Sequence, residues 1–145
     1  MSCAIRRIRF DQEATAPLIV EGADGDGRFL ARLKDEWKDG LCRFDGSGEF
    51  LLGAFDAEPL VGVGGITADP YQPAEGLARL RHLYVSKRWR GRGIGRALVL
   101  ELVSGARANF AVLRLRTQAP AAARLYESLG FVRTDAPNET HRLVL

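Results

Sequence analysis

The chain has few of the residues that would make it a disulfide-rich, membrane-spanning or secreted protein. Its two cysteines, Cys3 and Cys42, are too few for a disulfide framework and match no metal-ligand spacing. No apolar run approaches the ~18 residues of a membrane span, and the N-terminus lacks the apolar core of a signal peptide. With 46% hydrophobic and 27% charged residues, the composition is that of a globular protein. We therefore predict a single cytoplasmic domain over residues 1–145, with no metal site and no membrane contact.

Lysine is also scarce, since only three of the 21 basic residues are lysines and the others are arginines. The arginines are concentrated in one part of the chain. Residues 79–116 contain ten basic residues and one acid, which gives this segment a net charge of +9, whereas the remainder carries −6. A basic segment in an otherwise acidic chain indicates a local anionic ligand rather than a surface that coats nucleic acid.

Hydrophobic periodicity and turn-forming residues predict one mixed sheet with helices. Loops are expected at 21–27 and 69–76, which are rich in glycine, aspartate or proline. Helices are expected at 29–40, 94–108 and 120–130, and strands at 2–10, 50–55, 60–66, 77–85, 110–116, 131–133 and 141–145. The resulting order, β-α-β-β-β-α-β-α-β-β, predicts an α+β fold.

Glycine is abundant where the predicted strand 77–85 leads into the predicted helix 94–108, in the segment LYVSKRWRGRGIGR at 83–96. Glycines allow successive backbone N–H groups to close on one anion, and the helix N-terminus adds a partial positive charge. Arg88, Arg90, Arg92 and Arg96 add full charges at the same place, so this arrangement favours a pyrophosphate. The alternative is a plain strand-to-helix turn with a solvated basic rim.

Two other phosphate-binding patterns do not fit this segment. Gly95-Arg96-Ala97 lacks the Lys-Ser/Thr that ends a Walker loop. Gly91, Gly93 and Gly95 have the wrong spacing for the Gly-x-Gly-x-x-Gly loop of a dinucleotide-binding fold.

The same segment resembles the signature of the GCN5-related N-acetyltransferase (GNAT) family. Leu83-Tyr84-Val85 matches the apolar-aromatic-Val end of that family's central strand, and Arg90-Gly91-Arg92-Gly93-Ile94-Gly95 matches its Gln/Arg-x-x-Gly-x-Gly/Ala loop. A second segment, AARLYESLGF at 122–131, is similar to the family's Ala-x-x-Leu-Tyr-x-x-x-Gly-Phe helix. The resemblance covers essentially the whole chain and implies a mostly antiparallel sheet of six or seven strands flanked by helices.

The resemblance implies an acetyl-CoA-dependent enzyme that transfers the acetyl group directly to a primary amine of a small molecule or peptide. In this family the strand end pairs with the pantetheine arm and the loop amides hold the pyrophosphate. The expected cofactor-binding residues are therefore Leu83, Tyr84, Val85, Arg90, Gly91, Arg92, Gly93, Ile94, Gly95 and Arg96. A splayed strand beside Leu83 would offer an N–H to the thioester carbonyl. Cys3 and Cys42 are not needed as nucleophiles.

Tyr126 stands where the family often places the hydroxyl that protonates the departing thiolate, although packing under Phe131 is the alternative. The general base is less clear, because Arg79 occupies the position at which many relatives carry a glutamate. His82 is the nearest titratable substitute, and its alternative role is packing. Asp69 and Glu75 are weaker candidates for the base.

Arg79 and Arg81 further suggest that the acceptor amine carries an acidic group, which the two guanidinium groups would bind. The alternative is that they pair with acids such as Glu49 or Glu58 on neighbouring strands.

Two other functions remain open from the sequence. One is a degenerate GNAT-fold protein that binds or senses CoA without turnover, because the family's usual glutamate is absent and Ala119 replaces an asparagine that the family often has. The other is an RNA-contacting module, which the scarcity of exposed aromatics around the basic segment disfavours. We predict no nucleic-acid partner. A homodimer is compatible with the resemblance.

Overall fold

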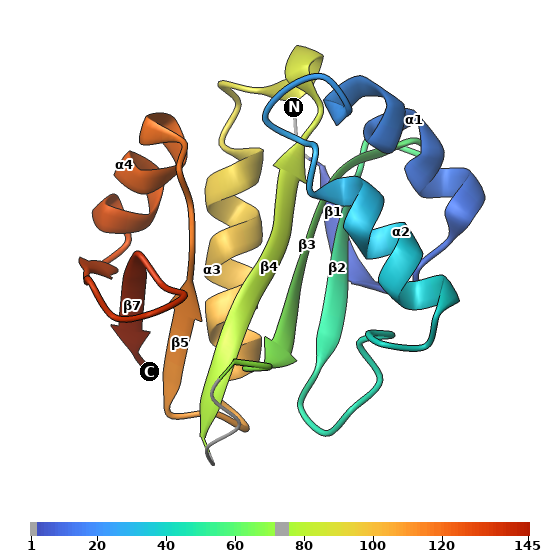
Figure 1. Ribbon diagram of the computed structural model, residues 1–145. Helices are drawn as coiled ribbons and strands as arrows, with labels where there is room; N and C mark the ends of the chain where they lie inside the picture. The colour runs from blue at the N-terminus through green and yellow to red at the C-terminus, as the bar shows by residue number, and fades with distance from the viewer. Residues whose placement is uncertain (1–2, 72–75) are drawn as a thin grey trace.

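A computed structural model describes residues 3–71 and 76–145 (Figure 1). Within these residues the strands form one seven-stranded sheet of order β1-β2-β3-β4-β5-β7-β6, in which β4–β5 is the only parallel pair. The strands are β1 (Ala4–Ile8), β2 (Phe50–Phe55), β3 (Leu60–Ala68), β4 (Leu77–Val85), β5 (Val112–Leu115), β6 (Val132–Arg133) and β7 (His141–Val144). The helices are α1 (Gln12–Gly22), α2 (Leu30–Lys38), α3 (Ile94–Ala106) and α4 (Pro120–Ser128). The predicted α+β class and mostly antiparallel sheet are confirmed.

The centre of the sheet is buried on both faces, because helices cover each side of β2 and β3 (Figure 1). On one face Leu51 and Val63 pack with Leu30 and Leu33 of α2. On the other face Leu52 and Ala54 of β2 pack with residues of α3 such as Leu98. This burial explains why β2 and β3 are almost continuously apolar rather than alternating. No helix in the described part of the chain is long and apolar enough to cross a membrane.

Helix α1 was not predicted from the sequence, and it corrects the expected element order by adding a second helix before β2. The side chain of Asp11 caps it by accepting hydrogen bonds from the backbone N–H groups of Glu13 and Ala14, at 2.9 and 3.3 Å. Its pattern is weak because it contains β-branched residues and Pro17, which lacks the N–H for the usual helical hydrogen bond. The expected loop 21–27 accordingly begins two residues later, after Gly22.

Two irregularities open the sheet along β4. The first is a bulge: Val63 pairs with Tyr84 and Gly65 with Arg81, so that two residues of β4, His82 and Leu83, oppose one residue of β3. His82 has a φ of 61°, a left-handed conformation that is uncommon for a residue other than glycine. The second is a divergence of the parallel strands, because β4 pairs with β5 only from Leu77 to Arg79. Beyond Arg79 the two strands separate, as Figure 1 shows.

A buried ion-pair network holds the closed end of this split. The Arg114 side chain on β5 is 2% exposed and lies 3.1 Å from an oxygen of Asp69 and 2.6 Å from one of Glu139. Arg114 also donates to the carbonyl of Pro137 at 2.8 Å, and Glu139 accepts from Arg142 at the same distance. These contacts connect the loops before β4 and β7 to β5. They therefore stabilise the end of the split at which β4 and β5 still pair.

Candidate active site

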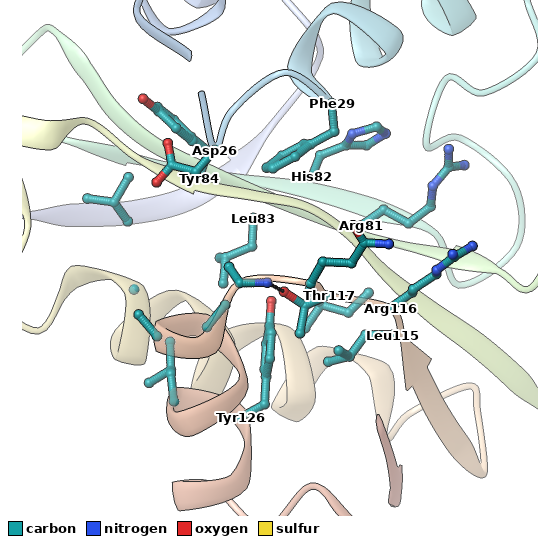
Figure 2. Close-up of a pocket in the computed structure, with 18 of the residues that line it drawn as sticks. Asp26, Phe29, Arg81, His82, Leu83, Tyr84, Leu115, Arg116, Thr117 and Tyr126 are labelled. Atoms are coloured by element: carbon teal, nitrogen blue, oxygen red, sulfur yellow. Dashed lines mark hydrogen bonds between the residues drawn. The ribbon is translucent and has the colours of Figure 1, made fainter. Parts of the chain in front are cut away.

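The split between β4 and β5 is the floor of a cleft of about 1270 Å³, into which the close-up in Figure 2 looks. Its walls come from four parts of the chain: the outer half of β4, the turn that begins α3, the segment from Leu115 into α4, and the α1–α2 connection. These segments lie far apart in the sequence, and the fold brings them together. Every sequence-predicted site residue except Arg92 lines the cleft.

The glycine-arginine turn forms a set of inward amides at one end of the cleft. Gly91 and Gly93 have φ values of 77° and 81°, which glycine adopts without the steric penalty of a side chain. A Cβ atom at either position would meet nothing within 4 Å, so these glycines are required by conformation and not by crowding. The first hydrogen bond of α3 runs from the N–H of Ala97 to the carbonyl of Gly93, at 3.0 Å.

The preceding amides of the turn are therefore not used by the helix ladder, and the helix dipole adds positive potential to them. The N–H of Arg90 is an exception, since it donates to the carbonyl of Lys87 at 3.3 Å. Arg92 lies over the ring of Trp89, with its guanidinium carbon 4.7 Å from the ring centroid. The geometry from Gly91 to Arg96 thus suits an anion such as a phosphate.

The side chain of Arg90 holds the turn in place and is not directed at a free anion site. Its guanidinium group donates to Asp26 at 2.7 and 3.3 Å and to the carbonyl of Val85 at 2.9 Å. Hydrogen bonding from Arg90 lowers the pKa of Asp26. The ion pair joins the α1–α2 connection to the turn, a contact that the sequence pattern did not indicate.

Tyr84, one of the expected cofactor residues, is likewise committed through its side chain. Its hydroxyl donates to Glu21 at 2.6 Å, and Glu21 also accepts from the Ser86 hydroxyl at 3.0 Å and from the Lys87 N–H. Burial and the bond to Glu21 raise the pKa of Tyr84. The side chain therefore ties α1 to β4. What this strand end offers a ligand is its backbone from Leu83 to Val85, apart from the Val85 carbonyl, which accepts from Arg90.

Tyr126 projects from α4 toward the split, with its oxygen directed at Thr117 (Figure 2). Its ring meets Phe131 edge-on at 5.4 Å between centroids, so the packing role expected as an alternative is present. The residue also lines the cleft, and burial raises the pKa of its phenol. A phenol in this state keeps its proton at physiological pH and is able to donate it. Thr117 was missed by sequence reasoning; its hydroxyl accepts from the N–H of Ala119 at 3.2 Å, just before α4.

His82 lines the opposite wall, beside Phe29 (Figure 2), and its side chain is 4% exposed. Neither ring nitrogen has a hydrogen-bond partner among the described residues, and Nε2 lies 3.9 Å from a carboxylate oxygen of Glu36. Burial, followed by the charges of Arg81 and Arg32, lowers the pKa of His82 to about 3. The imidazole is therefore neutral at physiological pH and a weak proton acceptor. The bulge at His82 explains why a polar residue interrupts a buried strand.

Arg79 and Arg81 line the same end of the cleft, and both have acidic partners, although not the ones expected. Arg81 donates to both carboxylate oxygens of Glu36, at 3.1 and 2.8 Å. Arg79 is 3.9 Å from Asp69 and lies over the ring of Tyr71, and burial lowers its pKa. The partners come from α2 and from the loop after β3, so the expected pairing with neighbouring strands was wrong.

Of the remaining sequence candidates, those that the structure describes do not line the cleft. Asp69 is fully buried between Arg114 and Arg79 and does not line it, so its carboxylate is occupied by ion pairs. Glu75 lies outside the described residues. Cys3 and Cys42 are free thiols that do not line the cleft, and burial raises the pKa of Cys42.

A sheet split between two parallel strands, with a glycine-rich turn and a buried phenol lining one cleft beside the split, is the arrangement that the acetyltransferase resemblance predicted. Comparison with known proteins agrees. The model of the acetyltransferase (GNAT) domain matches residues 47–133, which is more than half of the chain, and the chain therefore belongs to this family.

Two mycobacterial proteins are similar in sequence. N-alpha-acetyltransferase RimI of Mycobacterium tuberculosis is 35% identical over 92 residues, which cover 63% of this chain and 58% of RimI. Protein ML0378 of Mycobacterium leprae, which is uncharacterized, is 36% identical over 104 residues, covering 62% of this chain and 29% of its own length. The match thus spans less than two thirds of each relative.

Solved structures share the whole fold at low sequence identity. An acetyltransferase structure from Exiguobacterium sp. 255-15 superposes with a TM-score of 0.86 at 24% identity, covering 99% of this chain and 94% of that one. A phosphinothricin acetyltransferase of Sinorhizobium meliloti, solved in complex with AcCoA, has a TM-score of 0.77 at 19% identity and covers 100% of this chain and 89% of that one. At these identities the likeness establishes the fold.

Proposed function

We propose that this protein is an acetyl-CoA-dependent N-acetyltransferase that transfers the acetyl group directly to the primary amine of a small molecule or peptide. The observation that carries the proposal is a single cleft that joins three features: the unpaired edge of β4, the amides of residues 91–96 and the buried phenol of Tyr126. Family membership and the AcCoA complex of a protein with the same fold support the choice of cofactor.

The residues present fit acetyl-CoA. Nothing lies within 4 Å of the place that a Cβ atom would take at Gly91 or Gly93, so no side chain crowds the turn whose amides would hold the pyrophosphate. The backbone of Leu83–Val85, which β5 leaves unpaired, would hydrogen-bond the pantetheine arm like an added strand. When bound, acetyl-CoA supplies an activated acetyl group as a thioester.

The chain's own groups have separate roles in this proposal. Tyr126 holds a proton at its hydroxyl oxygen for the departing sulfur, because burial keeps the phenol protonated. The bulge at Leu83 interrupts regular pairing with β3 and is the place from which a backbone N–H would support the carbonyl oxygen. His82 would accept the amine proton only if its buried ring nitrogens became accessible and its pKa rose from about 3. The arginines at this end also lower the pKa of a bound ammonium group, which favours the reactive neutral amine.

Thermal melting tests cofactor binding, and release of free thiol in the presence of amines tests turnover. Acetyl-CoA at about 100 times its Kd should raise the free energy of unfolding by about 2.7 kcal/mol, which corresponds to roughly 8 °C in Tm for a chain of this size. The absence of a shift would overturn the proposal.

A second function is favoured by one observation, namely that no accessible carboxylate or imidazole among the described residues replaces the family's usual base next to Arg79. A protein that binds CoA without turnover would show the melting shift but release no thiol with any amine. The two assays together therefore separate the enzyme from the CoA-binding protein.

A further inference from the structure

Besides Arg28 on the α1–α2 connection and the arginines of the glycine turn, four arginines line the cleft, and the structure divides them into two pairs. Arg79 and Arg81 are both partnered, by Asp69 and Tyr71 in one case and by Glu36 in the other. Their charges are therefore largely balanced within the protein. Arg81 in particular donates from one guanidinium nitrogen, Nη2, to both carboxylate oxygens of Glu36.

Arg32 and Arg116 make up the other pair. Both line the cleft and both are exposed, and in the described ranges 3–71 and 76–145 neither takes part in an ion pair. They come from opposite walls, Arg32 from α2 and Arg116 from the end of β5. Figure 2 shows Arg116 at the same end of the cleft as Arg81 and His82. Arg32 is close enough to His82 for its charge to act on the ring.

Two unpaired guanidinium groups on facing walls have a physical consequence for the acceptor. A simple alkylammonium ion would be repelled from this end of the cleft. An amine that also carries an anionic group would instead gain charge-assisted hydrogen bonds to the same arginines, which are suited to planar recognition of carboxylate and phosphate. The arginines therefore select for amines with a second, negatively charged group.

We propose that the acceptor is a small amine carrying an anionic group, and that Arg116 and Arg32 bind this group from the two walls of the cleft. The proposal depends on the acetyl transfer proposed above and names the substrate class for that reaction. It assigns the recognition to different residues from those that the sequence suggested, because Arg79 and Arg81 are already occupied. A carboxylate and a phosphate share the required chemistry, and the test distinguishes them.

The experiment compares amines with and without an anionic group: β-alanine with β-alanine amide, and phosphoethanolamine with ethanolamine. Thiol release at saturating acetyl-CoA gives kcat and KM for the natural chain and for the variants Arg116→Gln and Arg32→Gln. Arg107→Gln is the control, because Arg107 is equally exposed but follows α3 and does not line the cleft. Melting shifts with acetyl-CoA are measured for each variant.

The expected result is that at least one anionic amine exceeds its neutral partner in kcat/KM by about tenfold or more. Arg116→Gln and Arg32→Gln should each raise KM for that amine by about tenfold. KM for the partner without the anionic group should stay the same or fall, because a repelling charge is removed, and the acetyl-CoA melting shift should not change. The member of the pair that responds identifies carboxylate or phosphate. Arg107→Gln should change nothing. The same anionic amine should also raise the Tm of the acetyl-CoA-saturated natural chain. It should not raise the Tm of the acetyl-CoA-saturated Arg116→Gln variant.

Other outcomes overturn the proposal. Equal kcat/KM for anionic and neutral amines would refute anion selection while leaving acetyl transfer intact. A loss of the acetyl-CoA shift in either variant would assign these arginines to the cofactor instead. Absence of both thiol release and an acetyl-CoA shift in the natural chain would refute the enzyme itself, which is a separate result.

Discussion

The three glycines of the turn before and within α3 make a sharp test of the proposed phosphate site, because the structure gives them different requirements. Gly93 has a φ of 81°, whereas Gly95 lies within α3 and has no positive φ. For an alanine, a left-handed conformation costs roughly 1–2 kcal/mol, whereas alanine in place of glycine within a helix gains up to about 1 kcal/mol. A Cβ atom at Gly95 would lie 3.7 Å from Leu125 and Val85, an ordinary contact.

The matched variants are therefore Gly93→Ala and Gly95→Ala. At about 3 °C per kcal/mol for this chain length, Gly93→Ala should lower the Tm of the free protein by roughly 3–6 °C, and Gly95→Ala should leave it equal or raise it slightly. If the backbone at residue 93 relaxes to a negative φ, the Tm penalty shrinks but the amide turns away from the anion.

In either case the affinity for acetyl-CoA should fall in Gly93→Ala and stay unchanged in Gly95→Ala. Losing one hydrogen bond to a charged group corresponds to about tenfold or more in Kd, which reduces the ligand-induced shift by about 4 °C at fixed acetyl-CoA. The assay is differential scanning fluorimetry with and without acetyl-CoA, supported by calorimetric titration. The reasoning is refuted if both variants behave alike, or if Gly93→Ala retains both the Tm and the full shift.

Three further predictions follow from individual side chains. Tyr126→Phe should lower kcat by about 100-fold or more while leaving the acetyl-CoA melting shift unchanged, and an unaltered kcat would assign the phenol to packing alone. Asparagine tolerates the left-handed φ at residue 82, so His82→Asn is the variant of choice. It should leave the acidic limb of the plot of kcat/KM against pH unchanged, because the ring has a pKa of about 3 and its nitrogens are buried. A displaced limb would support His82 as the base. Burial alone would raise the pKa of Glu139, but hydrogen bonds from Arg142 and Thr134 lower it to about 2. The ionised form of Glu139 therefore stabilises the fold above the unfolded pKa of about 4.3, and this contribution is lost as the pH falls through 2. Glu139→Gln should lower the free energy of unfolding by roughly 3 kcal/mol at pH 7 and by progressively less in acid, as measured by urea unfolding.

Much of the part of the molecule that forms the cleft could be predicted from the sequence because its signals are local. Glycines at 91 and 93 are needed by the backbone of the turn itself, and Pro120 and Gly130 bracket α4 for reasons that involve only neighbouring residues. The positively charged segment 79–116 likewise contains the turn. The β2–β3 hairpin was recognisable because its turn closes on itself, with the N–H of Asp56 bonded to the carbonyl of Pro59.

Helix α1 escaped prediction because its stability comes from packing and a cap more than from periodicity. Thr15 and Leu18 are buried, but the residues between them include Pro17 and no clear polar face. Its last turn nevertheless supplies Glu21, which fixes Tyr84 and the start of the 3-10 turn at Lys87.

The sequence by itself determined the family signature, the glycine turn and the identity of the phenol, since each depends on residues within one short segment. Only the tertiary structure decided which charges are available to a ligand. Arg81 lies 45 positions from Glu36 in the sequence, and Arg90 lies 64 positions from Asp26. No local sequence pattern predicts either ion pair. Because a charge is neutralised by whatever lies within a few ångströms of it, the difference between the paired Arg81 and the unpaired Arg116 exists only once the chain has folded.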